Sequence, residues 1–270
     1  MMTPSLFSQS VFALGLDEAI DATAAAGFPV IELACRAPHF GLDTAGADPE
    51  RVAARIREAG LAVSALSLFN HLTDPDRLDA EVDAAATFIR AAPLFGTTVL
   101  KLTPGSPASA EATELHWETL RAGLERLVPL AREAGVRLAF ETHMRQLTDT
   151  LASSLRFLEL APAEVVGLTV DFSNLSFAGE SMAEAVPALA DRTLHTHVKN
   201  GTVDAEGGWH FLALDQGLTD YPEVLSLLAD AGYDGYLSIE CLGDDARTAP
   251  LATARRDLAI LQAWLHEVQP

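Results

Sequence analysis

Cysteine is scarce in this chain of 270 residues, which contains only Cys35 and Cys241. Two thiols cannot build the disulfide framework on which small secreted domains depend, so we expect both to be reduced. Each follows a segment that reads as a strand end, and neither has a neighbour in the sequence that would activate it as a nucleophile. The leading prediction therefore does not use a catalytic thiol.

Basic charge and long apolar runs are also lacking. The chain has 18 Lys and Arg against 38 Asp and Glu, which gives a formal net charge of −20. A surface of this sign repels nucleic acid and anionic membranes, so we exclude both as partners. No apolar run approaches the length of a membrane span, and the first residues lack the basic and apolar regions of a signal peptide. We therefore expect a soluble, cytoplasmic protein.

What the sequence does contain is an alternation of strand-like and helix-like segments. Strands are predicted at 5–12, 30–33, 61–68, 98–102, 137–141, 166–171, 193–197 and 236–240, and helices at 16–26, 49–59, 75–95, 110–134, 147–160, 182–190, 221–231 and 251–268. Four of the helices end in Ala-Gly, which fits a left-handed helix terminus turning back into a strand. Eight such units predict a single α/β domain over residues 1–270, a (β/α)8 TIM barrel. A doubly wound open sheet is the alternative, weakened because no Gly-rich phosphate loop follows the first strand.

Four potential metal ligands stand at the ends of consecutive predicted strands: Glu141, Asp171, His197 and Glu240. In a parallel barrel all strands deliver their last side chains to the same mouth. Two Glu, one Asp and one His make an oxygen-rich site for a divalent cation. Three carboxylates gathered without a cation would repel one another, so the pattern predicts a metal centre.

The residues around these ligands resemble a known superfamily over nearly the whole chain. The segments that carry the resemblance are Phe140-Glu-Thr-His143, Val170-Asp-Phe-Ser-Asn174, His195-Thr-His-Val-Lys-Asn200 and Gly235-Tyr-Leu-Ser-Ile-Glu240. They resemble the xylose isomerase-like TIM barrel superfamily and, within it, the sugar phosphate isomerase/epimerase branch, which includes ketose 3-epimerases, hydroxypyruvate isomerase and inosose dehydratase. The resemblance implies one divalent ion on the four ligands, Mn²⁺ first, with Mg²⁺, Co²⁺ or Zn²⁺ as alternatives. It also implies a small sugar substrate and a homo-oligomer, either a dimer or a tetramer.

The leading prediction for this site is an isomerase or epimerase of a keto-sugar or keto-polyol. A divalent ion that chelates adjacent substrate oxygens acidifies the C–H next to the carbonyl and stabilises the resulting enediolate. By resemblance, Glu141 and Glu240 stand on opposite faces of the substrate, and one removes a proton while the other returns one. Two departures from the epimerase pattern leave the substrate open. Asn174 stands where those enzymes often have a histidine, and Lys199-Asn-Gly stands where they tend to have an arginine.

His143 supports an alternative prediction, a lyase of the same superfamily. Alternation along an extended segment puts Glu141 and His143 on the same side, so that the histidine would lean over the substrate. Its ordinary pKa suits a general acid or base near neutral pH. Glu-x-His at this place resembles inosose dehydratase and the enzymes that release aglycones from 3-oxo C-glycosides. In such a lyase the same enolate would expel a leaving group from the next carbon. The simpler interpretation is a loop histidine bonded to the backbone.

Five further residues are candidate substrate contacts: Asn174, Lys101, His71, Glu32 and Lys199. Glu32 could instead support a ligand from behind, and His195 either supports His197 or packs inside the barrel. The loop with Trp209 and Phe211 either covers the site or packs on the surface. A phosphodiesterase with several metal ions is disfavoured by the acidic surface and by the lack of further His/Asp clusters in the sequence. A non-enzymatic binding barrel is the last alternative.

Overall fold

Eight parallel strands close into a barrel in the computed structural model, which describes residues 1–268. In chain order the barrel strands are β1 (Thr3–Phe7), β2 (Val30–Ala34), β3 (Ala62–Ser67), β4 (Val99–Leu102), β5 (Arg137–Glu141), β6 (Val166–Asp171), β7 (Thr193–Val198) and β10 (Tyr236–Ile239). Each strand pairs with the next along the chain, and β10 closes the ring against β1. The predicted (β/α)8 barrel is confirmed.

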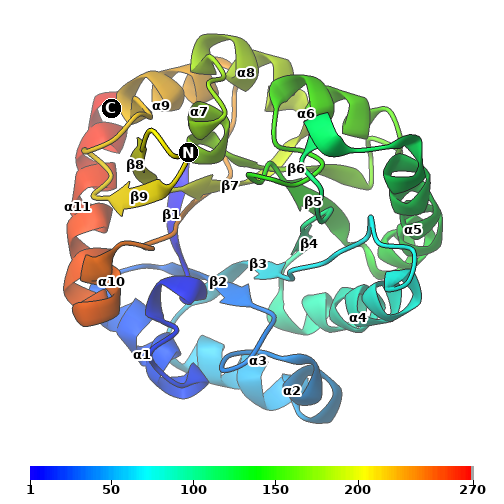
Figure 1. The fold of residues 1–270 in the computed structure, drawn as a ribbon. Coiled ribbons are helices and arrows are strands. Elements are labelled where there is room, and N and C mark those ends of the chain that lie inside the picture. Colours follow the sequence, from blue (N-terminus) through cyan, green and yellow to red (C-terminus); the bar gives the residue numbers. More distant parts are fainter. Residues whose placement is uncertain (269–270) are drawn as a thin grey trace.

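Helices surround the barrel on all sides (Figure 1). The longer ones are α1 (Leu16–Ala26), α3 (Pro49–Glu58), α4 (Leu78–Ala91), α5 (Glu114–Ala134), α6 (Leu151–Leu158), α8 (Met182–Leu189), α9 (Tyr221–Asp230) and α11 (Pro250–Val268). Gly27 after α1 and Gly135 after α5 have φ values of 96° and 67°, so both end their helices in the left-handed conformation that the Ala-Gly pattern predicted.

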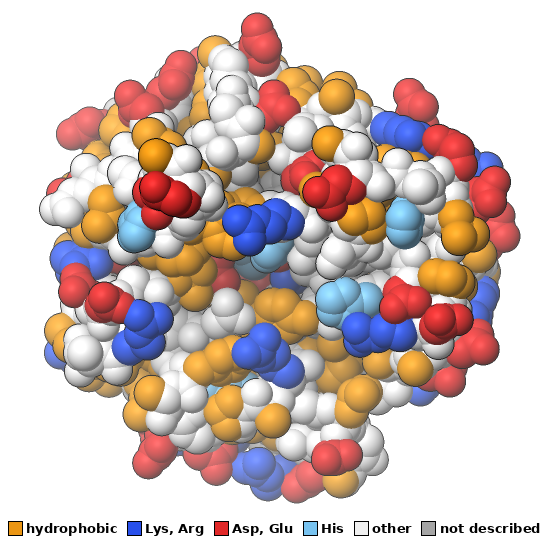
Figure 2. Space-filling model, in the orientation of Figure 1, with side chains coloured by type: hydrophobic (Ala, Val, Ile, Leu, Met, Phe, Trp, Pro, Cys, Tyr) orange, Lys and Arg blue, Asp and Glu red, His pale blue; other side chains and the backbone are white. Residues whose placement is uncertain are grey.

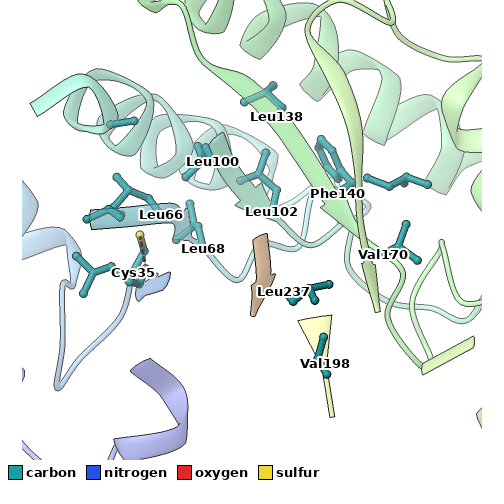
Figure 3. Packing of buried hydrophobic residues seen from close by; sticks show 14 of the residues in the cluster. Cys35, Leu66, Leu68, Leu100, Leu102, Leu138, Phe140, Val170, Val198 and Leu237 are labelled. Atoms are coloured by element: carbon teal, nitrogen blue, oxygen red, sulfur yellow. Dashed lines mark hydrogen bonds between the residues drawn. The ribbon is translucent and has the colours of Figure 1, made fainter. Parts of the chain in front are cut away.

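Alternation along the strands separates the apolar core from the interior of the barrel. Leu100 and Leu102 on β4 are fully buried in the main apolar cluster, as are Leu138 and Phe140 on β5. Figure 3 shows these side chains gathered along neighbouring strands. The residues between them face the opposite way because strand side chains alternate, so Lys101 and Glu141 point into the barrel. The same alternation that builds the helix-packed core therefore sends charged side chains to the mouth.

The structure differs from the predicted elements at several places. The first strand ends at Phe7, and Ser8–Val11 is a 3-10 helix rather than the end of a strand over 5–12. α4 ends at Ala91, just before Pro93, whereas Pro129 lies inside α5 without ending it. A proline within a helix removes one backbone hydrogen bond and crowds the carbonyl four residues earlier, so it can either end the helix or be accommodated inside it.

Three short helices and a hairpin lie where the sequence predicted loops. The helices are α2 (Leu42–Ala47), α7 (Phe172–Phe177) and α10 (Asp244–Thr248). After β7 the chain forms β8 (Asn200–Val203) and β9 (Trp209–Leu212), an antiparallel pair outside the barrel. Elements of four to six residues are too short to show a period in the sequence, which is why they were missed.

Two expectations on composition can be checked among the described residues. Cys35 and Cys241 are both free, in line with the expectation of reduced thiols, and both are buried. In residues 1–268 no helix combines the length and apolarity that a membrane crossing requires.

Candidate functional site

Three of the four predicted ligands meet inside the barrel. Glu141 ends β5, Asp171 ends β6 and His197 lies near the end of β7. Their ligand atoms lie within 4.8 Å of one another, and all three side chains are buried. The strand register explains the meeting, because Asp171 is directly paired with His197 across β6 and β7.

Glu240, the fourth predicted ligand, is separated from these three residues by the ammonium group of Lys199. It follows the last residue of β10, and its Oε1 accepts a hydrogen bond of 2.9 Å from Gln9 Nε2. Lys199 Nζ lies 2.7 Å from Glu240 Oε2 and 2.7 Å from Asp171 Oδ2. The fourth predicted ligand is therefore at the mouth but is separated from the other three by the side chain of Lys199.

The carboxylate of Asp171 uses its two oxygens differently. Oδ1 accepts the backbone N–H of Asn174 at 3.0 Å and caps α7. Oδ2 is buried, pairs with the Lys199 ammonium at 2.7 Å and lies 3.9 Å from His197 Nδ1. A buried carboxylate oxygen that faces an imidazole nitrogen and already pairs with a positive charge is in a position where a metal cation could take the place of that charge.

His197 has its metal-facing nitrogen fixed by Glu32 on β2. Its Nε2 lies 2.9 Å from Glu32 Oε1, so Nε2–H donates to that carboxylate. Nδ1 is then the nitrogen that faces Glu141 Oε1, at 3.2 Å. A lone pair beside a carboxylate oxygen is repulsive unless a proton or a metal ion lies between them. The donor set of Glu141, Asp171 and His197 therefore fits a divalent cation.

Burial and charge act against each other on these groups. Burial disfavours the charged imidazole, but Glu32 and Glu141 together raise the pKa of His197 to about 10 when no metal is bound. Burial likewise opposes ionisation of Glu141, but Lys101 and His197 hold the pKa of Glu141 well below its ordinary value. Burial raises the pKa of Asp171, although Lys199 acts in the opposite direction.

Lysine is rare in this chain, and both lysines are in the site. Lys101 and Lys199 are the only lysines, so the other 16 of the 18 basic residues are arginines. Lys101 is fully buried and lies 2.5 Å from Glu141 Oε2, and Lys199 is only 4% exposed. Figure 2 shows basic and histidine side chains around the central hollow of this face. Most acidic side chains lie nearer the periphery of the same face. The sequence already contains this signal for the site, because both of its lysines stand close to predicted strand ends.

The other predicted contacts divide between the mouth and its support. Glu32 is fully buried and accepts hydrogen bonds from both His195 Nε2 and His197 Nε2, so its geometry serves support rather than contact with substrate. Asn174 is buried too, and its Nδ2 donates to the backbone oxygen of Thr142 at 2.9 Å. His71 is partly exposed in the loop after β3.

Glu32, His195 and His197 form a second group of close potential ligands, which the sequence did not reveal. The two histidines are neighbours on β7, but Glu32 is 163 residues from His195 in the chain. Both imidazoles donate to Glu32, so this group is a hydrogen-bonded support of the metal-facing histidine.

Aromatic side chains that the sequence analysis did not single out also form the site. The ring of Phe7 stacks on His197 with centroids 5.1 Å apart and on Phe69 with centroids 6.2 Å apart. Lys101 Nζ lies 4.5 Å from the centroid of Phe69, and Arg36 lies over the same ring at 4.9 Å. These rings give the mouth an apolar wall that carries two cations.

The β8–β9 hairpin contacts the loop after β5. Arg145 lies over the ring of Trp209 at 4.3 Å and donates to the backbone oxygen of Gly207 at 3.3 Å. The hairpin also borders a cavity of about 970 Å³, whose lining includes Phe211, Cys241 and Arg256. Of the two roles predicted for this loop, the contact with Arg145 favours a cover over the site.

Comparison with known proteins gives the family. A family model described as a xylose isomerase-like TIM barrel matches residues 20–264. This chain belongs to that family. The superfamily to which the motifs pointed is thereby confirmed.

Curated relatives of the family match this chain over part of their length. Inosose dehydratase of Lacticaseibacillus casei is 27% identical over 168 residues, which is 57% of this chain and 56% of that protein. Inosose dehydratase 2 of Bacillus cereus (strain ZK / E33L) is 29% identical over 164 residues, 56% of this chain and 55% of that protein. The chain thus spans little more than half the length of these relatives.

Solved structures share the fold at low identity. The probable 3-DHS dehydratase AsbF from Bacillus anthracis has a TM-score of 0.81 and 19% identity, over 97% of this chain and 99% of that one. L-ribulose 3-epimerase has a TM-score of 0.79 and 22% identity, over 100% and 96%. The IOLI protein with a bound zinc atom has a TM-score of 0.82 and 13% identity, over 99% of each chain. At these identities the comparisons show the fold alone.

Proposed function

We propose that this protein is a metal-dependent lyase that removes water from a keto-polyol, with His143 as its acid and base. The observation that carries the proposal is the position of His143, which follows Glu141 by two residues, lies close enough to influence its charge and is partly exposed, while its Nδ1 bonds to the backbone oxygen of Met144 at 2.8 Å. A carbonyl oxygen only accepts, so Nδ1 bears the proton of the neutral ring and Nε2 keeps its lone pair. The ring is partly exposed, so Nε2 can reach a proton of a bound substrate.

The two glutamates are less suited to move protons. Glu141 Oε2 is paired with Lys101, and Glu240 Oε2 is paired with Lys199. Burial raises the pKa of Glu141, but Lys101 and His197 outweigh burial and hold this pKa well below its ordinary value, which makes Glu141 a weak base. The geometry therefore favours the histidine-based lyase over the two-glutamate epimerase.

In the proposed reaction a divalent ion on Glu141, Asp171 and His197 would polarise the substrate carbonyl and stabilise the enolate oxygen. His143 Nε2 takes the proton from the carbon next to the carbonyl. The electron pair of that C–H bond forms a C=C bond, and the hydroxyl on the following carbon leaves. His143 then gives its proton to the leaving hydroxyl, so that one water is lost and the ring is neutral again. Lys101, whose buried ammonium pairs with Glu141 inside the barrel, would hold a substrate oxygen.

The relatives support the same reaction class. The curated proteins with which this chain shares 25–29% identity are named as inosose dehydratases. A keto-cyclitol of the inosose type is therefore the first substrate class to test, and open keto-sugars follow.

An epimerase is the second candidate, because Glu141 and Glu240 both lie at the ends of barrel strands, where each pairs with a lysine. In that reaction the abstracted proton is replaced on the same carbon, and no water is lost.

The experiment compares the wild type with His143→Gln on inososes and keto-sugars in D₂O, with Mn²⁺, Co²⁺ or Zn²⁺ supplied. A lyase forms a conjugated enone, seen as near-ultraviolet absorbance, whereas an epimerase incorporates deuterium without it. We expect His143→Gln to lower enone formation by roughly 10²–10⁴-fold while metal binding is retained. His266→Gln, an exposed position on α11, is the matched control. Full activity of His143→Gln would refute the assignment.

A further inference from the structure

Lys199 holds the one carboxylate oxygen that a metal ion needs. Its Nζ lies 2.7 Å from Asp171 Oδ2, and Oδ2 is the oxygen turned toward His197 Nδ1. The other oxygen of Asp171 is committed to the N-cap of α7 through the backbone N–H of Asn174. A cation bound to Asp171 and His197 must therefore take the place of the Lys199 ammonium at Oδ2.

Lys101 is arranged differently, although it also pairs with a predicted ligand. It contacts Oε2 of Glu141, whereas Oε1 is the oxygen that faces His197 Nδ1. The pair of Lys101 with Glu141 can thus persist when Oε1 binds a metal. The two lysines of this chain consequently have different relations to the same centre.

Lys199 also keeps the fourth ligand away from the other three. Its ammonium lies 2.7 Å from both Asp171 Oδ2 and Glu240 Oε2, so it occupies the space between the two carboxylates. Glu240 does not belong to the group of ligand atoms that lie within 4.8 Å of one another. Removal of the ammonium from this space would let Glu240 approach the ion.

We propose that Lys199 is a displaceable internal counter-ion, which neutralises Asp171 and Glu240 in the metal-free protein and leaves Asp171 Oδ2 when a divalent ion binds. The proposal rests on the metal centre of the proposed function and is independent of the reaction. The released ammonium then serves as a hydrogen-bond donor for substrate in the mouth. Lys199 is thus a substrate contact only in the metal-loaded protein, so metal binding must precede productive substrate binding.

The hairpin offers a place for the released ammonium. Lys199 Nζ pairs with Glu240 and lies 5.8 Å from the ring centroid of Phe211 on β9. A change of side-chain rotamer could therefore move the ammonium from the carboxylates toward this ring. The face of an aromatic ring attracts a cation at such distances. Displacement of Lys199 would therefore bring its side chain nearer to Phe211.

The first test uses the fact that the chain has only two lysines. Wild-type protein labelled with ¹³C at lysine Cε gives two lysine signals, which Lys101→Arg and Lys199→Arg assign by removing one signal each. The protein is stripped of metal and titrated with Zn²⁺, which is diamagnetic. We expect the Lys199 signal to shift, with its protons moving upfield as they near Phe211, while the Lys101 signal moves less. Zinc binding that leaves the Lys199 signal in place would overturn the proposal.

The second test compares Zn²⁺ affinities of Lys199→Met and Lys101→Met by calorimetry. Each variant removes one buried positive charge beside the centre, but only Lys199→Met removes the competitor for Asp171 Oδ2. We expect Lys199→Met to bind Zn²⁺ roughly tenfold more tightly than the wild type and Lys101→Met to gain less. Equal gains would show a general charge effect and overturn the proposal, as would weaker binding by Lys199→Met. The NMR titration is made on the wild-type protein, so it still decides the proposal if Lys199→Met folds poorly.

The two tests separate this proposal from the proposed function. Zinc that binds in an Asp171-dependent way without moving Lys199 refutes the displacement and leaves the lyase standing. Displacement of Lys199 in a protein that forms no enone from any keto-polyol supports the counter-ion and counts against the lyase.

Discussion

Replacing Glu32 by glutamine should weaken metal binding, although Glu32 contacts only the nitrogen of His197 that faces away from the proposed metal ion. Glu32 Oε2 lies 2.9 Å from His195 Nε2, and Glu32 Oε1 lies 2.9 Å from His197 Nε2. A carboxylate accepts both N–H groups, whereas a glutamine amide offers one acceptor oxygen and one donor nitrogen. One of the two histidines must then lose its partner, and His197 Nδ1 is no longer held toward the site.

The expected loss follows from such support of a ligating histidine. Mutation of an outer partner costs about 10–100-fold in metal affinity, which corresponds to about 1.4–2.7 kcal/mol. The unpaired buried imidazole should also lower the free energy of unfolding of the metal-free protein by about 3 kcal/mol. Calorimetric titration with Zn²⁺ or Mn²⁺ measures the first quantity, and denaturant unfolding measures the second.

The matched control is Glu81→Gln. Glu81 is also a buried carboxylate, 8% exposed, and it accepts a hydrogen bond of 3.1 Å from Asn70 in a position on α4. This variant should lower stability by about 1 kcal/mol and leave metal affinity unchanged. If Glu32→Gln bound metal as tightly as the wild type and Glu81→Gln, the supporting role of Glu32 would be wrong.

Three further outcomes test the core, the metal centre and the response to acid. Phe140→Ala should destabilise the protein by about 3–5 kcal/mol, because Phe140 is fully buried with its ring 4.8 Å from that of Phe157; an unfolding midpoint near that of the wild type would contradict this. Asp171→Asn should hold much less divalent ion than the wild type when both are compared by elemental analysis, since it removes the charge of the oxygen that faces His197, and equal metal content would exclude this site. Burial lowers the pKa of His39 to about 4, so the unfolded chain binds the extra proton between about pH 6.5 and pH 4 and stability falls as the pH drops through that range. After allowance for partial hydration of the ring we expect a loss of about 2 kcal/mol, absent in His39→Gln, and parallel unfolding curves of the two proteins would contradict it.

Much of the fold could be predicted from local pattern. The Ala-Gly helix ends and the short apolar strands recur at regular spacing, and each depends only on residues close together in the chain. The four ligands could be found in the same way, because a parallel barrel brings every strand end to one mouth. Glu141, Asp171 and His197 needed no tertiary information beyond that rule.

The relations among the charged groups could not be predicted in this way. Glu32 and His195 are 163 positions apart, and Lys199 meets Glu240 across 41 positions. The sequence left Glu32 open between substrate contact and support, and it gave both lysines as candidate substrate contacts near strand ends. Which oxygen each ammonium holds depends on strand register and side-chain rotamer, which no local pattern contains.

The sequence by itself determined the barrel, the direction of its strands and the residue types at its mouth, because alternation and helix termination are local properties of the chain. Only the tertiary structure decided that Glu240 is separated from the other ligands by Lys199, that Glu32 orients His197, and that a hairpin reaches Arg145. Those choices come from packing charges in a space without water, where each buried carboxylate must find a partner from a distant part of the chain.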